Sequence, residues 1–404
     1  MQQNSKSVIS QGLIFLLALA AGISVANLYY NQPLLADIAK TFHISFQKVG
    51  LLSTYTQLGY ALGIFLFVPL GDIREKRKII LILISLVTAS LIGVATSHNI
   101  TLLYVFSFTV GLTTGIPQLI VPLVAQLVAP EKRGKAIGTI ASTMLIGILM
   151  ARTVSGSIGY MFGWRYMFAF AASMMGILGV VLYFKLPKTQ TVENLNYLKL
   201  LRSLFEITKK YGALRKAAIT GTMMFGAFSM FWTTLTFLLE SPAFGLNTNQ
   251  IGLFGLVGVV GAMGARMIGG LNDKLSSNKI ILSCIFIGII SYSVLGLSPL
   301  NIWVVIIGII TLDFGVQGTM VSNQTVIMGI SSNEGSRLNT VFIVANFIGG
   351  AIGSAVGSLA WELYGWSGVC SVGFSMIFVA LVINMNLQNT KVAVRAQLLR
   401  IKNK

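Results

Sequence analysis

Long apolar stretches recur along almost the whole chain, and they constrain its fold more than any other feature. A helix needs roughly 20 apolar residues to cross the hydrocarbon core of a bilayer. A hydropathy reading with that window finds twelve such stretches. Their approximate bounds are 12–33, 48–70, 79–97, 101–128, 136–160, 165–184, 215–239, 249–271, 279–298, 302–329, 338–360 and 366–387. The sequence therefore predicts an all-α membrane protein with twelve transmembrane helices.

The composition excludes most other classes of protein. Only 10% of the 404 residues are charged and 55% are hydrophobic, whereas about a quarter of the residues of a soluble domain are charged. This excludes a soluble enzyme, a secreted domain and a disordered chain. Cys284 and Cys370 lie inside apolar stretches, and His43 and His98 lie in short polar links. We therefore expect no disulfide framework, no metal site and no cofactor.

The positions of the 29 Lys and Arg residues predict the orientation of the spans. If the N-terminus is cytoplasmic and the spans alternate, 24 of the 29 fall in cytoplasmic segments, and only Lys40, Lys48 and Arg165 fall in outer loops. This bias follows the positive-inside rule. Both termini are predicted to be cytoplasmic, which requires an even number of spans. The net charge of +18 then reflects insertion and the anionic lipids of the inner leaflet rather than nucleic acid.

Two halves of the chain resemble each other at an offset of about 202 residues. The matches include Val49-Gly50-Leu51 with Ile251-Gly252-Leu253, Gly163-Trp164 with Gly365-Trp366, and Asp72 with Asp273 at 201. They predict an N-terminal six-helix bundle (1–184), a cytoplasmic linker (185–214), and a C-terminal six-helix bundle with a basic tail (215–404). Because six is even, the two bundles share one orientation and are related by an axis along the membrane normal.

The linker contains apolar residues at helical spacing between Tyr197 and Phe205. We interpret this segment as an amphipathic helix that lies on the inner leaflet. The alternative is a solvated linker with little stable helix.

Several segments resemble the major facilitator superfamily, and in particular a bacterial subgroup of twelve-span efflux-type permeases that includes predicted drug and sugar exporters. Pro69–Lys78 is similar to the motif of the loop between the second and third spans, an Asp followed by a basic cluster, and Gly269–Lys274 is similar to its second copy. Further similar stretches are Ala26–Pro33, Arg133-Gly134, Ala151–Gly156, Gly163–Arg165 and Val321–Gln324. The resemblance implies two pseudo-symmetric six-helix bundles, transport by alternating access, and a place in the bacterial cytoplasmic membrane.

Motifs for other energy sources and for enzymatic chemistry are missing from the sequence. It has no Walker A pattern, no HExxH and no nucleophile elbow. We therefore expect transport that is powered by a gradient, or facilitated diffusion, and no enzymatic activity. Proton-coupled export of a small organic molecule by a monomer is the favoured interpretation. An importer of a nutrient or metabolite, and a transporter-like receptor without net flux, are the alternatives.

Asp313 is the only acid near the middle of a predicted span, and Arg152 lies about two-thirds along the fifth. Charges inside the membrane are costly and are functional candidates by default. We predict that Asp313 carries protons and that Arg152 takes part in the coupling. Asp313 is alternatively a binding group for a cationic substrate, or a structural partner of Arg152 or of the backbone. Arg152 alternatively binds an anionic group or has a purely structural role, and Arg266 is explained by snorkelling to the cytoplasm.

Polar and aromatic residues within the spans are predicted to line a central cavity, because an unpaired amide is unfavourable in hydrocarbon. The candidates are Asn27, Tyr30, Gln57, Gln118, Trp232, Gln317, Asn323 and Asn346. Interhelical hydrogen bonds and contacts with lipid are the alternatives. Gly115 and Pro117 predict a local break in the fourth span.

Charged residues at the inner ends of the spans are predicted to form a cytoplasmic gate. They are Asp72, Arg74, Arg77, Arg133, Asp273, Lys274 and Arg337. Asp72 is expected to face the start of the eleventh span near Arg337, and Asp273 the start of the fifth near Arg133, because a carboxylate is favoured at a helix N-terminus. The alternative is a charge cluster that serves insertion only.

Overall fold

The computed structural model describes residues 10–188, 196–272, 274–297, 301–331 and 334–402, and side chains within these ranges except those of residues 262, 265, 266 and 386–402. The described chain is helical. The helices of the first half are α1 (Gln11–Ala26), η1 (Gln32–Leu34), α2 (Leu35–Phe42), α3 (Phe46–Ile73), α4 (Lys76–Thr96), α5 (Ile100–Thr113), α6 (Ile116–Leu127), α7 (Pro130–Phe162) and α8 (Trp164–Lys185). Those that follow are α9 (Tyr197–Lys210), α10 (Gly212–Glu240), α11 (Thr248–Asn272), α12 (Ser277–Leu297), α13 (Ile302–Met328) and α14 (Gly335–Lys402).

The twelve predicted spans correspond to these helices. Within the described part of the chain, nine helical segments are long and apolar enough to cross a membrane, and α1 and the first part of α11 are shorter apolar helices. α5 and α6 form one span, and α14 contains two spans because Gly365 breaks the helix with φ 60° and ψ −151°. A positive φ of this kind favours glycine. The predicted fold of two six-helix bundles is confirmed.

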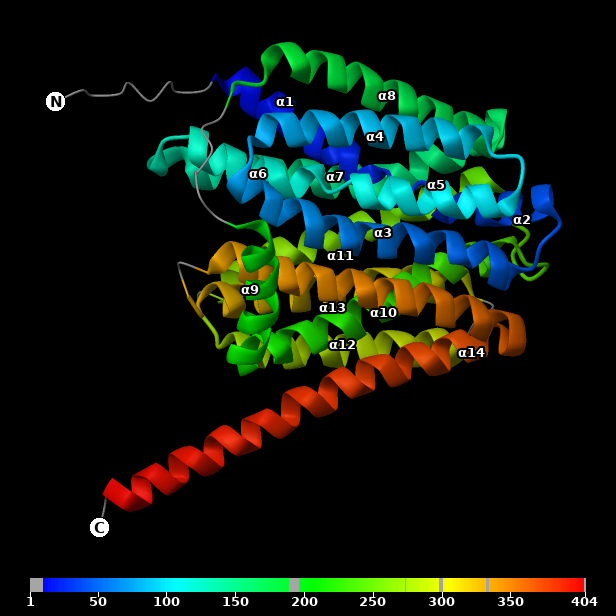
Figure 1. The fold of residues 1–404 in the computed structure, drawn as a ribbon. Helices are drawn as coiled ribbons and strands as arrows, with labels where there is room; N and C mark the ends of the chain where they lie inside the picture. Colours follow the sequence, from blue (N-terminus) through cyan, green and yellow to red (C-terminus); the bar gives the residue numbers. More distant parts are fainter. Residues whose placement is uncertain (1–9, 189–195, 273, 298–300, 332–333, 403–404) are drawn as a thin grey trace.

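Figure 1 shows how the bundles are arranged. The spans run roughly parallel, with the first half above the second, and α9 crosses the spans at one end of the molecule. α1 begins and α14 ends at this end, which we call the α9 end; α2 lies at the opposite end, the α2 end.

The first span is shorter than the sequence predicted. The expected stretch was 12–33, but α1 ends at Ala26, and residues 27–31 form turns before η1. Asn27 and Asn31 favour turns, and Pro33 removes a backbone donor and disfavours helix in the residue before it. In the fourth span the break predicted at Gly115 is present, since α5 ends at Thr113 and α6 begins at Ile116.

The two halves are in close contact at the α2 end. There α7 crosses α11 so closely that a Cβ on Gly156 would lie 2.7 Å from the Cα of Gly252. Thr153 donates a hydrogen bond of 3.0 Å to the carbonyl of Gly252. Backbone approach of this kind requires small residues.

Near the α9 end the glycines of the same two helices have free space beside them. A Cβ on Gly134 or Gly138 of α7, or on Gly269 or Gly270 of α11, would meet no atom within 4 Å. The close contact between α7 and α11 therefore lies at the α2 end, where small residues let the two backbones meet.

Candidate functional site

Asp313 lies on α13 in the interior of the C-terminal bundle. Its side chain is buried, and its Oδ1 accepts a hydrogen bond of 3.2 Å from the indole Nε1 of Trp232 on α10. Two glycines of α11 lie against this side chain, where any larger residue would clash with it. A Cβ on Gly258 would lie 2.8 Å from Oδ2, and a Cβ on Gly261 would lie 2.7 Å from the Cβ of Asp313. These two glycines of α11 therefore leave the space that the buried side chain of Asp313 occupies.

Arg152 approaches the same indole from the N-terminal half. Its guanidinium carbon lies 3.9 Å from the ring centroid of Trp232 and 5.0 Å from that of Tyr29. Its Nε donates a 2.7 Å hydrogen bond to Oε1 of Gln32, whereas its buried Nη2 has no hydrogen-bond partner. A cation stacked on an aromatic face in a water-poor site is stabilised by about 2 kcal/mol or more.

Trp232 therefore contacts both charged groups. Among the described residues no ion pair within 4 Å joins Arg152 to Asp313, although the two charges interact electrostatically. Opposite charges act over a longer distance in the interior of a protein than in water. Because Arg152 belongs to one half and Asp313 to the other, any motion between the halves changes this interaction.

A second polar cluster joins the halves within one turn of Trp232 along α10. Nε2 of Gln57 on α3 donates to the hydroxyls of Ser229 at 2.5 Å and Ser354 at 3.0 Å, on α10 and α14. The hydroxyl of Ser354 also lies 3.0 Å from that of Thr233. Oε1 of Gln57 is buried and has no partner. Gln57, which the sequence singled out, thus lies between the halves.

The remaining cavity candidates are in varied surroundings. Asn27, Asn323 and Asn346 are buried, and each has an amide atom without a hydrogen-bond partner. Gln118 is half-buried and interacts with the hydroxyl of Tyr60, and Gln317 is half-buried on α13.

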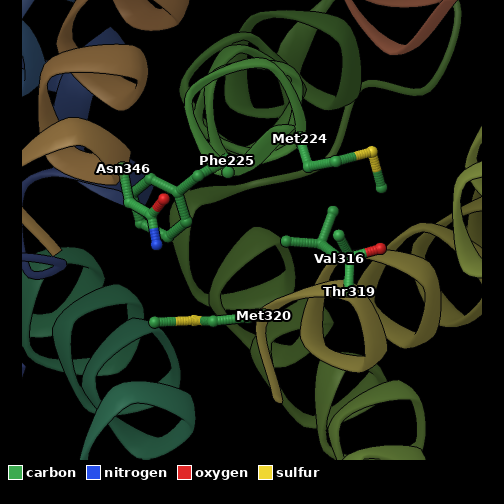
Figure 2. A pocket seen from close by; sticks show the side chains of 7 residues that line it. Met224, Phe225, Val316, Thr319, Met320 and Asn346 are labelled. Carbon is green, nitrogen blue, oxygen red and sulfur yellow. The ribbon is translucent and has the colours of Figure 1, made fainter. Parts of the chain in front are cut away.

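Asn346 lines a small cavity among α10, α13 and α14, shown in Figure 2, with Met224, Phe225, Thr319 and Met320. The cavity measures about 10 Å³, which is room for a single water molecule.

Tyr30 lines a different space, an apolar groove of about 260 Å³ between α1, α7 and α8. Its backbone carbonyl accepts a hydrogen bond of 2.5 Å from Ser155 of α7. The ring is buried at the edge of this groove, within the N-terminal bundle.

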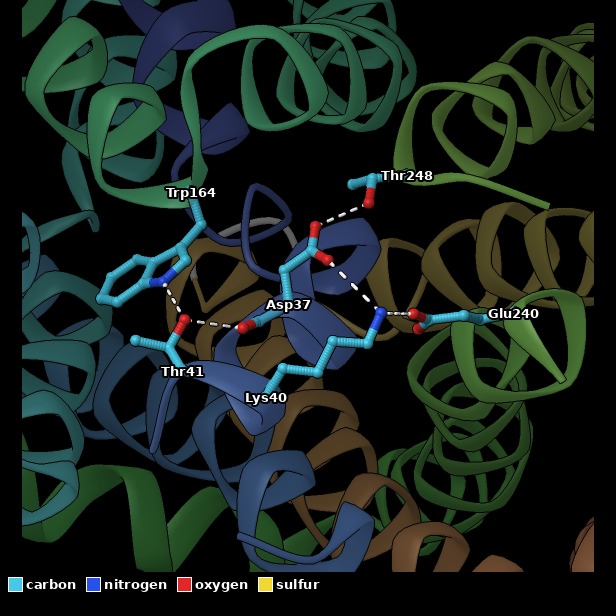
Figure 3. A network of polar contacts seen from close by, with 6 residues as sticks. All are labelled: Asp37, Lys40, Thr41, Trp164, Glu240 and Thr248. Atoms are coloured by element: carbon cyan, nitrogen blue, oxygen red, sulfur yellow. Dashed lines mark hydrogen bonds and ion pairs between the residues drawn. The ribbon is translucent and has the colours of Figure 1, made fainter. Parts of the chain in front are cut away.

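The α2 end is closed by a polar network that Figure 3 shows. Lys40 of α2 forms an ion pair with Glu240 at the end of α10, and Oδ2 of Asp37 accepts a hydrogen bond of 2.6 Å from Thr248 of α11. Both contacts join the halves. The hydrogen bond with Glu240 is the main cause that raises the pKa of Lys40 above its usual value. Lys40 therefore stays charged throughout the neutral range.

At the α9 end, Asp72 of α3 interacts electrostatically with Lys76 and with Arg337 of α14. Nη2 of Arg337 also lies 3.9 Å from Oε1 of Glu334, and Oε2 of Glu334 accepts a 2.6 Å hydrogen bond from the hydroxyl of Tyr211, just after α9. That hydrogen bond is the largest cause that lowers the pKa of Glu334. Glu334 is therefore ionised at neutral pH and connects the linker to the gate.

The gate candidates Arg77 and Arg133 form hydrogen bonds within the first half of the chain. Arg77 donates a hydrogen bond of 2.7 Å to the carbonyl of Tyr183, and Nε of Arg133 donates one of 3.1 Å to the carbonyl of Val128. Arg74 and Lys274 are exposed. Asp273 and the side chain of Arg266 lie outside the described residues.

Comparisons with known proteins decide the family. The sequence model of the Major Facilitator Superfamily matches residues 17–354. The chain belongs to the major facilitator superfamily. It is 39% identical over 375 residues to the uncharacterized transporter YgaY of Escherichia coli O157:H7, covering 93% of this chain and 95% of that one. It is 31% identical over 358 residues to the probable transporter SCO4007 of Streptomyces coelicolor, covering 88% of this chain and 83% of that one.

Solved structures of this superfamily share the fold. A bacterial homolog of the human lysosomal transporter Spinster, in an inward-facing conformation, has a TM-score of 0.76 at 13% identity, with 95% of this chain and 96% of that one covered. The nucleoside transporter NupG has a TM-score of 0.76 at 12% identity, with 93% and 99% covered. As a member of the superfamily, the protein is a multi-pass membrane transporter for a small molecule and not an enzyme.

Sequence reasoning missed several residues that join the two halves of this transporter. Ser229 and Ser354 are common residues with no distinctive spacing, and only the three-dimensional contact with Gln57 reveals them. The opposite charges of Lys40 in α2 and Glu240 at the end of α10 were a detectable signal, but the two residues are 200 positions apart in the sequence.

Proposed function

We propose that the protein is a secondary active transporter that exports a small organic molecule across the bacterial cytoplasmic membrane in exchange for protons. The observation that carries the proposal is the contact of one indole, Trp232, with Asp313 of one half and Arg152 of the other. Asp313 would carry the proton, and Arg152 would link its protonation to the motion of the halves.

Opening of the α2 end supplies the coupling. It must separate α7 from α10 and α11, so it withdraws Arg152 from Trp232 and Asp313. A nearby cation favours the ionised carboxylate, and its removal from a buried acid favours the protonated form. Asp313 therefore takes up a proton when the α2 end is open and releases it when Arg152 returns.

The direction follows from the orientation that the basic residues predict. We place the α2 end outside and the α9 end, with both termini, in the cytoplasm. A proton then enters from outside and leaves to the cytoplasm, and its inward movement drives a substrate outward.

We assign residues 1–184 and 215–404 to the two moving bundles. We propose that the protein acts as a monomer in contact with anionic lipid at the inner leaflet.

The candidate cavity and gate residues have separate roles in this proposal. Asn27, Gln57, Gln118, Gln317, Asn323 and Asn346 would offer hydrogen bonds to the substrate, with Tyr30 and Trp232 as aromatic walls. Asp72 and Arg337 would close the cytoplasmic side, with Asp273 and Arg133 as the symmetric pair and Arg74, Arg77 and Lys274 as neighbouring charges.

Proton release on ligand binding tests the proposal. A thermal-shift screen of the purified protein against drugs, sugars, amino acids and organic anions first supplies a ligand. Adding that ligand to weakly buffered protein is expected to release protons, up to about one per transporter, because substrate and proton alternate on Asp313. The variant Asp313→Asn should bind the ligand without release. Ligand binding that releases no proton from the unaltered protein between pH 6 and 8 would refute proton exchange.

A further inference from the structure

The outward face of α9 combines cations with large apolar side chains. Leu198 is 72% exposed and Phe205, seven residues on, is 61% exposed. Exposed Lys199, Arg202, Lys209 and Lys210 share the face with a single acid, Glu206. Arg202 pairs with Glu206 at 3.1 Å and Lys210 with Glu334 at 3.6 Å. Within the described part of the chain no ion pair involves Lys199 or Lys209. The face therefore carries uncompensated positive charge beside exposed apolar groups.

The opposite face of α9 fixes the helix to the transporter. Leu204 and Ile207 are buried. The hydroxyl of Tyr197 donates a hydrogen bond of 2.9 Å to the carbonyl of Leu66, near the inner end of α3. Figure 1 shows α9 lying across the ends of the spans, where the bilayer surface would be. An amphipathic helix with cations and apolar groups on one face is suited to an anionic lipid surface.

A chain of contacts leads from α9 to the gate. Lys210 and Tyr211 hold Glu334, Glu334 lies beside Arg337, and Arg337 interacts with Asp72 of the other half. Glu334 and Asp72 thus both interact electrostatically with Arg337. A shift of α9 that moves Lys210 and Tyr211 changes how strongly Glu334 competes with Asp72 for Arg337.

We propose that the outward face of α9 binds the headgroups of anionic phospholipids, and that this binding regulates the cytoplasmic gate through Glu334 and Arg337. The lysines bind the phosphate groups, and Leu198 and Phe205 enter the acyl boundary. Each cation near an anionic surface contributes about one kcal/mol, which is about a fivefold change in affinity. The inference does not depend on which substrate is carried or on proton coupling.

Hydrogen exchange on the full-length protein in nanodiscs tests the inference. Discs of phosphatidylcholine are compared with discs that also contain phosphatidylglycerol. Phosphatidylglycerol is expected to slow exchange in α9 by about tenfold or more and to slow it at the start of α14 as well. The variant Lys199→Gln/Lys209→Gln should lose most of both effects. Lys132→Gln/Lys135→Gln, which removes two exposed lysines at the same membrane side, should retain them.

Two further experiments distinguish lipid binding at α9 from its effect on the gate, and membrane lipid from a soluble phosphate. Tyr211→Phe removes only the hydroxyl that holds Glu334, so it should keep the slowing in α9 and weaken that in α14. Soluble glycerol 3-phosphate, added to phosphatidylcholine discs, should have no effect. Equal exchange in both kinds of disc, equal losses in the two double-lysine variants, or an effect of glycerol 3-phosphate would each overturn the proposal.

Discussion

Replacing Asp313 with Asn is expected to reduce transport driven by a pH gradient strongly, while exchange of substrate across the membrane continues. The amide fits the same space and still accepts from Trp232, but it cannot bind and release a proton. Coupling free energies between linked sites are typically about 1–3 kcal/mol, so gradient-driven flux should fall by about 5- to 150-fold. The measurement is uptake into everted vesicles, with and without an imposed pH gradient, of a ligand that stabilises the purified protein.

Glu131→Gln provides the matched control for that experiment, because it also removes one carboxylate. Glu131 is exposed in the first turn of α7 and takes no part in the proposed mechanism. Flux in this variant should respond to the pH gradient as in the unaltered protein. A normal response in Asp313→Asn would remove Asp313 from the mechanism. Uptake into everted vesicles also establishes direction, since an importer would load vesicles of the opposite orientation.

The second large effect is expected at the crossing of α7 and α11. Gly156→Val places a branched side chain where a Cβ already lies 2.6 Å from the carbonyl oxygen of Thr248. Overpacking of this kind costs about 1–3 kcal/mol, and here the cost applies to the conformation in which the α2 end is closed. The variant should therefore favour the conformation open at that end. Modification of a cysteine introduced at Thr153 by a membrane-impermeant thiol reagent should become about 5- to 150-fold faster.

Gly138→Val serves as the control on the same helix. A Cβ at Gly138 meets no atom within 4 Å, so the closed conformation should accommodate the side chain and the modification rate should not change. If Gly138→Val opened the α2 end as strongly as Gly156→Val, the contact between α7 and α11 would not be what holds that end closed.

The sequence predicted the fold well because the deciding signals are local. The length of each apolar stretch can be read directly from the sequence and shows whether it can cross a membrane. Gly115 and Gly365 lie where the chain leaves helical geometry. Where the prediction of the first span was too long, Asn27, Asn31 and Pro33 outweighed the apolar character of their neighbours. Turn-forming residues therefore end a helix even inside an apolar stretch.

The candidate site was predictable only where a residue type is rare. An acid in mid-span stands out, so Asp313 was found, and Arg152 likewise. The position of Trp232 between them, and the serines around Gln57, depend on how helices distant in sequence pack together. The carbonyl partners of Arg77 and Arg133 depend on loop geometry, which charge patterns do not encode.

The most direct test of the account measures both ends of the α7–α11 pair at once. Spin labels at Tyr160 and Gln250 report the α2 end, and labels at Lys135 and Leu271 report the α9 end, in protein whose Cys284 and Cys370 are replaced with Ala. Pulsed electron resonance then gives both distances between pH 5 and 8. The account predicts that acid lengthens the first distance and shortens the second, and that Asp313→Asn makes both independent of pH. Distances that change in the same direction, or a pH response that persists in Asp313→Asn, would contradict it.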